Sequence, residues 1–166
     1  GRHLLALIND ILDLARIESG KIEITRTRFS PKTMVEEVLK MLDPLAREKE
    51  LQLTSRLDPD LPEAVISDAG HLRRCIINLV GNAVKFTHKG TVCVHAAAER
   101  HEDRTRLHLQ VSDTGIGIPP DKQHSVFESF CQADNSSTRV YCGTGLGLTI
   151  TKQIIEMRGG YITLES

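Results

Sequence analysis

Seven of the twelve glycines in this 166-residue chain lie between Asp113 and Tyr161. They form three groups: Gly115 with Gly117, then Gly143 with Gly145 and Gly147, and finally Gly159 with Gly160. Glycine interrupts helices and strands, and it lets the backbone approach a ligand closely because it has no Cβ atom. The first two groups therefore indicate turns at which the backbone contacts a bound molecule, and the third predicts the end of a helix.

The rest of the composition is that of a soluble globular domain. The 21 basic and 22 acidic residues give a formal charge of −1, which provides no overall field for steering the chain onto nucleic acid or an anionic membrane. The longest apolar run, Leu4 to Ile8, is far shorter than the ~20 residues that span a bilayer. Four cysteines without C-x-x-C spacing indicate reduced thiols: Cys75, Cys93, Cys131 and Cys142. We therefore expect a cytoplasmic protein that binds neither nucleic acid nor, directly, a membrane.

Apolar periodicity predicts helices that alternate with strands. Helices are expected over residues 1–18, 31–50, 69–86, 121–127 and 146–158, and strands at 22–24, 51–57, 65–66, 91–98, 107–111 and 161–164. Ser30 before Pro31, and Asp68 before the third helix, are predicted N-caps, because their side chains can accept from free amides. Pro44 is expected to bend the second helix, because its ring removes a hydrogen bond to the preceding turn.

Three polar residues of the predicted third helix share one face. Asn78 and Asn82 are four residues apart, and Lys85 follows three residues later. An amide oxygen is a hard ligand suited to Mg²⁺, and a nearby lysine supplies positive charge for phosphate. On the spacing alone, however, polar residues on the exposed face of a helix are the simpler interpretation.

The two glycine runs add a second line of evidence. Asp113 ends a predicted strand, where its carboxylate could accept a hydrogen bond from an exocyclic amine such as that of adenine, and Gly115 and Gly117 follow; a plain tight turn is the alternative. The run Gly143 to Leu148 opens a helix, whose free amides and dipole favour an anion. Neither run is a Walker loop or a dinucleotide fingerprint.

The order of these segments is more specific than any one of them. Asn-x-x-x-Asn-Ala-x-Lys at 78–85, Asp-x-Gly-x-Gly at 113–117, Phe-Glu-Ser-Phe at 127–130 and Gly-Thr-Gly-Leu-Gly-Leu at 143–148 follow one another. This series closely resembles the N box, the first glycine box, the F box and the second glycine box of sensor histidine kinases of two-component systems. The residues around Arg139 look most like the hybrid branch of that family. The resemblance covers nearly the whole chain.

The resemblance implies a fold and a site. The fold is a two-layer α/β (α+β) sandwich in which a mixed β-sheet packs on helices, preceded by one long amphipathic helix. Asn82 would coordinate Mg²⁺, Asn78 and Lys85 would meet the phosphates of ATP, Asp113 would bind the adenine amine, and Arg139 would reach the γ-phosphate. The remaining implied nucleotide contacts are Gly115, Gly117, Ile118, Gly143, Thr144, Gly145, Leu146, Gly147 and Leu148.

The resemblance also implies the organisation of the parent protein. Residues 1–20 resemble part of the dimerisation and phosphotransfer hairpin, and residues 21–166 resemble the catalytic ATP-binding domain without its last strand. The expected partners are that hairpin, which forms a dimer in the full protein, and a response-regulator receiver domain. The His-Glu-x-Arg-Thr-Pro-Leu phosphoacceptor run is absent, so the chain alone is not expected to autophosphorylate. Whether the parent is anchored in the inner membrane stays open, as does any redox role of the Cys131 and Cys142 pair.

Two other functions stay open beside the kinase, and one run of residues resembles the phosphoacceptor motif. A hydrolytic relative of the same fold, of the gyrase or chaperone kind, would need a carboxylate near the position of Asn78; a regulatory module that binds nucleotide without activity would not need an intact site. The run from His101 to Leu107 reads almost like the phosphoacceptor motif. It is expected between two strands, with Arg106 in place of the proline, and we interpret it as a coincidence.

Overall fold

The computed structural model describes residues 24–102, 104–128 and 145–166, with five isolated helical residues before them: Ile8, Ile11, Leu12, Ala15 and Ile17. It consists of two compact units. One is Ile24–Ile116, and the other is Gly117–Ser166 with Gly1–Glu23. Of the predicted segments, most of residues 1–18 and the loop from Cys131 to Cys142 lie outside the described residues.

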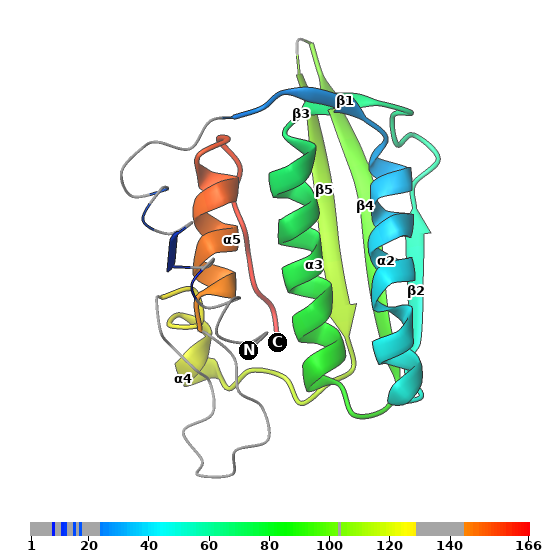
Figure 1. Cartoon of the computed structure of the whole chain (residues 1–166), viewed down its shortest axis with the longest axis vertical. Coiled ribbons are helices and arrows are strands. Elements are labelled where there is room, and N and C mark those ends of the chain that lie inside the picture. The colour runs from blue at the N-terminus through cyan, green and yellow to red at the C-terminus, as the bar shows by residue number, and fades with distance from the viewer. Residues whose placement is uncertain are drawn as a thin grey trace. The chain divides into compact units, whose positions relative to one another are not determined.

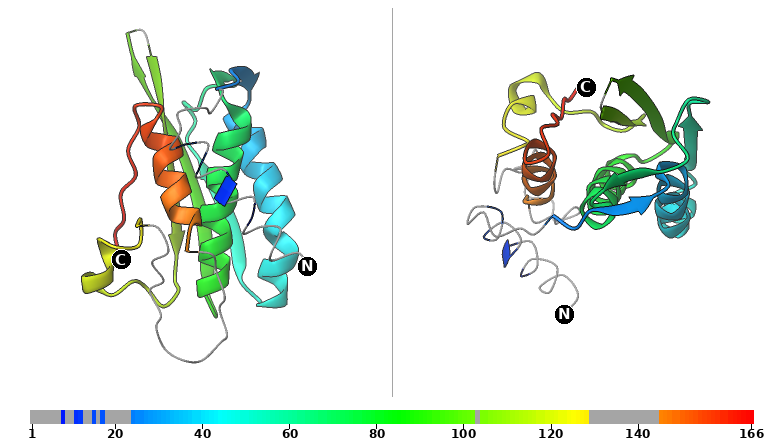
Figure 2. Two further views of the ribbon diagram at one scale, coloured as in Figure 1. Left: turned by 60° about the vertical axis from the view of Figure 1, so that its left-hand side comes forward. Right: turned by 90° about the horizontal axis from the view of Figure 1, so that it is seen from above.

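The unit Ile24–Ile116 is a two-layer α/β arrangement (Figure 1). Its elements are β1 (Thr27–Phe29), α2 (Pro31–Glu48), β2 (Gln52–Leu57), β3 (Val65–Ser67), α3 (Ala69–Phe86), β4 (Thr91–His101) and β5 (Arg104–Asp113). A mixed sheet has the order β2-β4-β5, with β2 parallel to β4 and β4 antiparallel to β5. Seen from above, α2 and α3 lie side by side on one face of these strands (Figure 2). The predicted fold class is confirmed.

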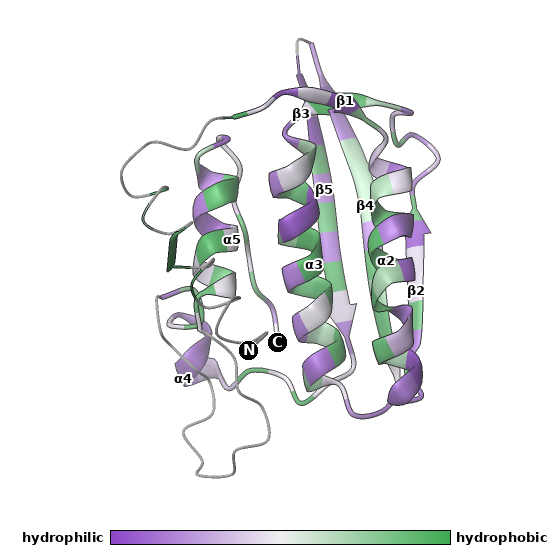
Figure 3. Ribbon diagram, in the orientation of Figure 1, coloured by the Kyte–Doolittle hydropathy of each residue, from purple (hydrophilic) through white to green (hydrophobic). Residues whose placement is uncertain are grey.

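Both helices begin where the sequence predicts. The Ser30 hydroxyl accepts from the Thr33 amide at 3.3 Å, and Pro31 occupies the first helical position of α2. The helix continues through Pro44 to Glu48. Figure 3 shows apolar and polar residues alternating along α2 and α3, as expected of helices that bury one side.

The core of this unit lies between the helices and the sheet. Val92, Val94 and Ala96 of the central strand β4 are completely buried, and their alternation with half-buried residues shows that one face of β4 packs on the helices. From α2, the side chains of Val35 and Val38 complete this layer. The core is almost entirely aliphatic, in keeping with the 4% aromatic content of the chain.

The unit containing residues 117–166 has two described helices, α4 (Pro120–Gln123) and α5 (Gly147–Glu156). Leu146, Ile150 and Ile154 recur at helical spacing and are buried. The helix ends before Gly159, which has a left-handed backbone with φ of +69°.

Several predicted boundaries are wrong. The helix expected over 121–127 is only the four-residue α4, and Ile24 precedes β1 instead of belonging to a strand. β4 and β5 extend beyond the predicted ranges and meet in a hairpin. The expected strand at 161–164 is irregular, because none of the described residues forms a ladder with it, and a strand requires such pairing.

Candidate functional site

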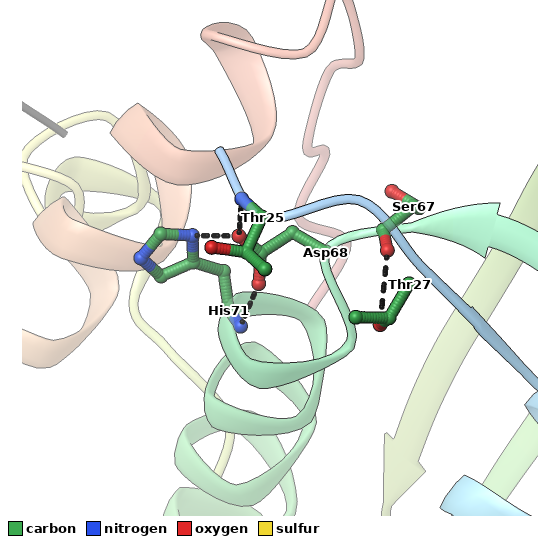
Figure 4. A network of polar contacts seen from close by, with 5 residues as sticks. All are labelled: Thr25, Thr27, Ser67, Asp68 and His71. Carbon is green, nitrogen blue, oxygen red and sulfur yellow. Dashed lines mark hydrogen bonds and ion pairs between the residues drawn. The ribbon is translucent and has the colours of Figure 1, made fainter. Parts of the chain in front are cut away.

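The helix α3 carries the first group of predicted site residues, and its start is fixed by Asp68. One oxygen of this carboxylate accepts from the His71 amide at 2.9 Å, and the other accepts from the Thr25 amide at 3.0 Å and lies 3.0 Å from His71 Nδ1 (Figure 4). Only 5% of Asp68 is exposed. The predicted N-cap is confirmed, and it also holds the chain at Thr25 beside the start of α3.

Asn78, Asn82 and Lys85 all lie on α3, as predicted. Each is half-buried, whereas Ile76, Val80 and other residues of the opposite side are buried in the core. The three side chains are therefore neither core residues nor fully exposed surface residues. The Lys85 ammonium lies 4.9 Å from the centre of the Phe86 ring, close enough for a cation–π interaction.

Asp113 is the last residue of β5, and its carboxylate is held on one side. Its Oδ1 accepts from the Gly115 amide at 2.8 Å and, at 3.5 Å, from the hydroxyl of Thr87, the fully buried residue that ends α3. Both contacts use Oδ1, and Oδ2 takes part in neither of them.

Gly115 fits closely between this carboxylate and α3. A Cβ atom at this position would lie 2.7 Å from both the Phe86 carbonyl oxygen and Asp113 Oδ1, and 3.0 Å from Thr87 Oγ1. Real Cβ atoms do not approach so closely, so this position requires glycine. The end of α3 and the turn after β5 therefore form one packed structure, in which the Ile116 amide also donates to Phe86 O at 3.4 Å.

The unit containing residues 117–166 holds the remaining described site residues. Gly117 and Gly145 both have a φ of +68°. The Ile118 amide donates to Ser166 Oγ at 2.6 Å. Leu146 is completely buried at the cap position of α5, where an apolar side chain cannot cap the first amides, which belong to Gly147, Leu148 and the residue after them.

The predicted site residues that the structure describes divide between the two units. Asn78, Asn82, Lys85, Asp113 and Gly115 belong to one unit, on α3 and at the turn that packs against its end. The other unit contains Gly117, Ile118, Gly145, Leu146, Gly147 and Leu148. The predicted residues Arg139, Gly143 and Thr144 lie outside the described part of the chain.

Sequence reasoning missed Thr87 and Lys49. Thr87 directly follows Phe86, and its place after a helix next to a predicted site lysine is a weak signal that could have identified it. Lys49, which donates to the last carbonyls of α3, is 36 residues from Lys85. Nothing local in the sequence marks Lys49, because its partners are distant in the chain.

None of the described helices is long and apolar enough to cross a membrane. Within the ranges that the structure describes, no three or more His, Cys, Asp or Glu side chains gather in a group that could hold a metal ion. A magnesium ion held chiefly by an asparagine and phosphate oxygens would need no such group.

Comparison with known protein families and sequences gives strong matches. Residues 67–166 match the family model described as histidine kinase-, DNA gyrase B- and HSP90-like ATPase. The chain is 44% identical over 163 residues to the sensory/regulatory protein RpfC of Xanthomonas campestris and 41% identical over 164 residues to the sensor histidine kinase GacS of Pseudomonas protegens. These alignments cover 97% and 98% of this chain but only 22% and 18% of the relatives, so the chain spans about a fifth of their length.

Solved structures agree with these matches. Full-length ShkA in complex with AMPPNP superposes with a TM-score of 0.82 at 35% identity, over 95% of this chain and 31% of ShkA. The histidine kinase AdeS of Acinetobacter baumannii shares the fold, with a TM-score of 0.71 at 24% identity, over 92% of this chain and 66% of AdeS.

Proposed function

Since the chain belongs to the family of histidine kinase-, DNA gyrase B- and HSP90-like ATPases, we propose that it is the ATP-binding catalytic part of a hybrid sensor histidine kinase. The intact protein would transfer the γ-phosphoryl group of Mg·ATP to a histidine on a phosphoacceptor helix, and then onward to an aspartate of a receiver domain. In this proposal residues 1–20 are part of the dimerisation hairpin and residues 21–166 form the ATP-binding domain. The parent protein would act on the cytoplasmic side, whether or not it is anchored in the inner membrane.

The observation that carries the proposal is the packing of Asp113 and Gly115 against the end of α3. One face of this helix presents Asn78, Asn82 and Lys85, and the fixed carboxylate of Asp113 lies at its end. With Oδ1 engaged by Gly115 and Thr87, Oδ2 can accept from the exocyclic amine of adenine. The complex of the similar protein ShkA with AMPPNP supports nucleotide binding by this chain.

By their positions in the family motifs, residues of α3 and residues of the second glycine run would contact the phosphates and the metal. The oxygen of Asn82 would bind Mg²⁺, because a half-buried amide is a hard, neutral ligand that leaves the ion free to hold phosphate oxygens and water. Asn78, Lys85 and the amides from Gly145 to Leu148 would orient the phosphates, with Gly143 and Thr144 beside them. Bound Mg²⁺ would neutralise the charge that spreads over the phosphoryl oxygens.

Arg139 would complete the electrostatic stabilisation at the γ-phosphate. Phosphoryl transfer needs little covalent chemistry from the protein, so orientation and positive charge supply most of the rate. Asn78 and Lys85 would do this from α3, and Arg139 would do it from the segment that precedes the second glycine run. These roles follow from the matching positions of the family motifs.

A hydrolytic function is disfavoured by the composition of α3. The helix contains no Asp or Glu at any of its 18 positions, so it offers no carboxylate that could deprotonate an attacking water. Asn78 occupies the place where the hydrolytic relatives would need that base. A phosphotransferase, whose acceptor is an imidazole, has no need of it.

Calorimetry of ADP binding with and without Mg²⁺ tests the proposal. Wild-type protein is expected to bind ADP more tightly when Mg²⁺ is present, and Asn82→Ala is expected to lose that enhancement, by about tenfold or more in affinity. Gln110→Ala, which removes an exposed amide from β5, is the matched control and should bind as the wild type does. The proposal would be contradicted if the wild type bound ADP equally well with and without Mg²⁺, or if the chain hydrolysed ATP rapidly.

A further inference from the structure

We propose that Lys49 is a positioning residue that sets the preference of the site for adenine, by fixing the end of α3 against which Asp113 packs. This inference rests on the proposed function, because it assumes that Asp113 reads the exocyclic amine. It assigns to the turn between α2 and β2 a role in nucleotide specificity.

The ammonium group of Lys49 gathers the last carbonyls of α3. Its Nζ donates to Val84 O at 2.8 Å, to Lys85 O at 2.6 Å and to Thr87 O at 3.3 Å. The last carbonyls of a helix have no partners within the helix, and they carry the negative end of its dipole. A half-buried ammonium that contacts three of them therefore fixes the backbone of residues 84–87.

Lys49 is itself held by a tight turn. It ends α2, and its amide and that of Leu51 both donate to Ala46 O, at 3.1 Å and 2.9 Å. Between them, Glu50 has a φ of +56°, in the left-handed region that non-glycine residues rarely adopt. The turn thus anchors the base of the lysine side chain while its tip binds the end of α3.

The fixed segment at 84–87 is the surface that shapes the turn after β5. Phe86 O accepts from the Ile116 amide and leaves no space for a Cβ atom on Gly115. The Thr87 hydroxyl lies 3.5 Å from Asp113 Oδ1. Thr87 therefore links the two groups, since its carbonyl accepts from the Lys49 ammonium and its hydroxyl contacts the Asp113 carboxylate. All of these residues belong to one unit.

Loss of the ammonium group is expected to affect the adenine contact more than the contacts that Asn78 and Asn82 make. Without it, the carbonyls of residues 84, 85 and 87 need water or new partners, and Thr87 no longer has a fixed position from which to hold Asp113. A hydrogen bond weakens steeply when its geometry is disturbed, so the contact with the amine is lost first. Asn82 and Asn78, about one and two turns from the helix end, keep their positions.

The test compares ADP with inosine diphosphate, which carries a carbonyl group where adenine has its amine. Wild-type chain should prefer ADP, because Asp113 accepts from the amine and repels a carbonyl. In Lys49→Met, which keeps most of the aliphatic stem, ADP affinity is expected to fall about tenfold while affinity for inosine diphosphate changes little. Lys40→Met, an exposed lysine of the same helix, is the matched control and should retain the preference.

A second variant separates positioning from folding. Thr87→Val replaces the buried hydroxyl by a methyl group of similar size, and should reduce the preference for ADP in the same direction without the loss of the ammonium. If both variants keep the wild-type ratio of affinities, or lose affinity for the two nucleotides equally, the inference is wrong. If the wild type itself does not discriminate, the proposed role of Asp113 fails first, and Mg²⁺-dependent binding then shows whether the rest of the proposed function stands.

Discussion

At the scale of single residues, Gly115 shows how a correct expectation can have a different physical cause. The sequence predicts that glycine is needed there so that the backbone can approach a ligand. In the structure, the nearest obstacles to a side chain are the Phe86 carbonyl, Asp113 and Thr87 of the protein itself. Glycine is thus required for the packing of the site before any ligand is considered.

Gly115→Ala should therefore damage both the fold and the site. The new Cβ atom would have to displace both the Asp113 carboxylate and the Phe86 carbonyl, and the carbonyl belongs to the backbone at the end of α3. We expect the free energy of unfolding to fall by about 1–3 kcal/mol, as for other overpacked positions. We also expect ADP affinity to fall tenfold or more, which is a loss of about 1.4 kcal/mol or more in binding free energy. Urea denaturation and calorimetry measure the two effects.

Gly81→Ala is the control for that substitution. Gly81 lies inside α3 with no atom within 4 Å of a new Cβ atom. Alanine there should stabilise the protein by about 0.5–1 kcal/mol, because glycine costs backbone entropy inside a helix. A Gly115→Ala protein as stable as Gly81→Ala would show that the contacts around Gly115 are looser than the structure indicates.

At the scale of elements, the sequence predicts α3 over nearly the same residues as the structure shows, Ala69–Phe86, and the reason is local. The apolar period over residues 69–86 and the cap at Asp68 are signals carried within the helix itself. The expected strand at 161–164 had only a four-residue alternation, and a strand also depends on a partner elsewhere in the chain. Lys49 was missed for the same reason, since its role depends on α3.

Asp68 is expected to contribute more than an ordinary cap. Asp68→Ala removes the acceptor for the His71 amide and also the acceptor for the Thr25 amide, which is near the start of this unit. Loss of a cap costs about 0.5–2 kcal/mol, and a value at the upper end is expected here because two amides lose their partner. Asp60→Ala, in an exposed turn, should change the free energy of unfolding by less than about 0.5 kcal/mol.

Hydrogen exchange can locate the loss. In Asp68→Ala, faster exchange is expected at the first turn of α3 and at Thr25, whereas the amides of β4 should change only as far as global stability does. Uniform acceleration across the unit would mean that Asp68 acts through overall stability and does not hold these two segments together.

At the scale of the whole molecule, the family motifs identified the fold and the family, whereas the site could be predicted only in part. The motifs are contiguous runs whose order is visible in the chain, so the resemblance found with them is confirmed by the comparisons. The geometry between runs depends on packing that no run encodes, such as the contact of Thr87 with Asp113. The proposed roles of Arg139, Gly143 and Thr144 stay predictions from the motif alone.

The place of residues 101–107 in the whole fold shows why this run, which resembles a phosphoacceptor motif, is not expected to act as one. His101 ends β4 and pairs with Arg104 across the β4–β5 hairpin, with its Nε2 3.4 Å from Glu99 Oε2. A phosphoacceptor histidine is expected on a helix that another domain can reach. His101 lies instead on a strand of the same unit that carries α3 and Asp113. The chain alone, mixed with radiolabelled Mg·ATP, should therefore acquire no acid-labile phosphate.

Adding a separate phosphoacceptor hairpin from a hybrid histidine kinase makes that negative result informative. Label is expected on the hairpin and not on the chain, and His101→Ala should label the hairpin at the wild-type rate, because His101 takes no part in transfer. Asn82→Ala should abolish labelling in the same assay, which shows that the signal depends on the proposed magnesium site. Label on the chain that disappears in His101→Ala would instead make this hairpin a second acceptor, and the resemblance of residues 101–107 to the motif would then have to be explained by function.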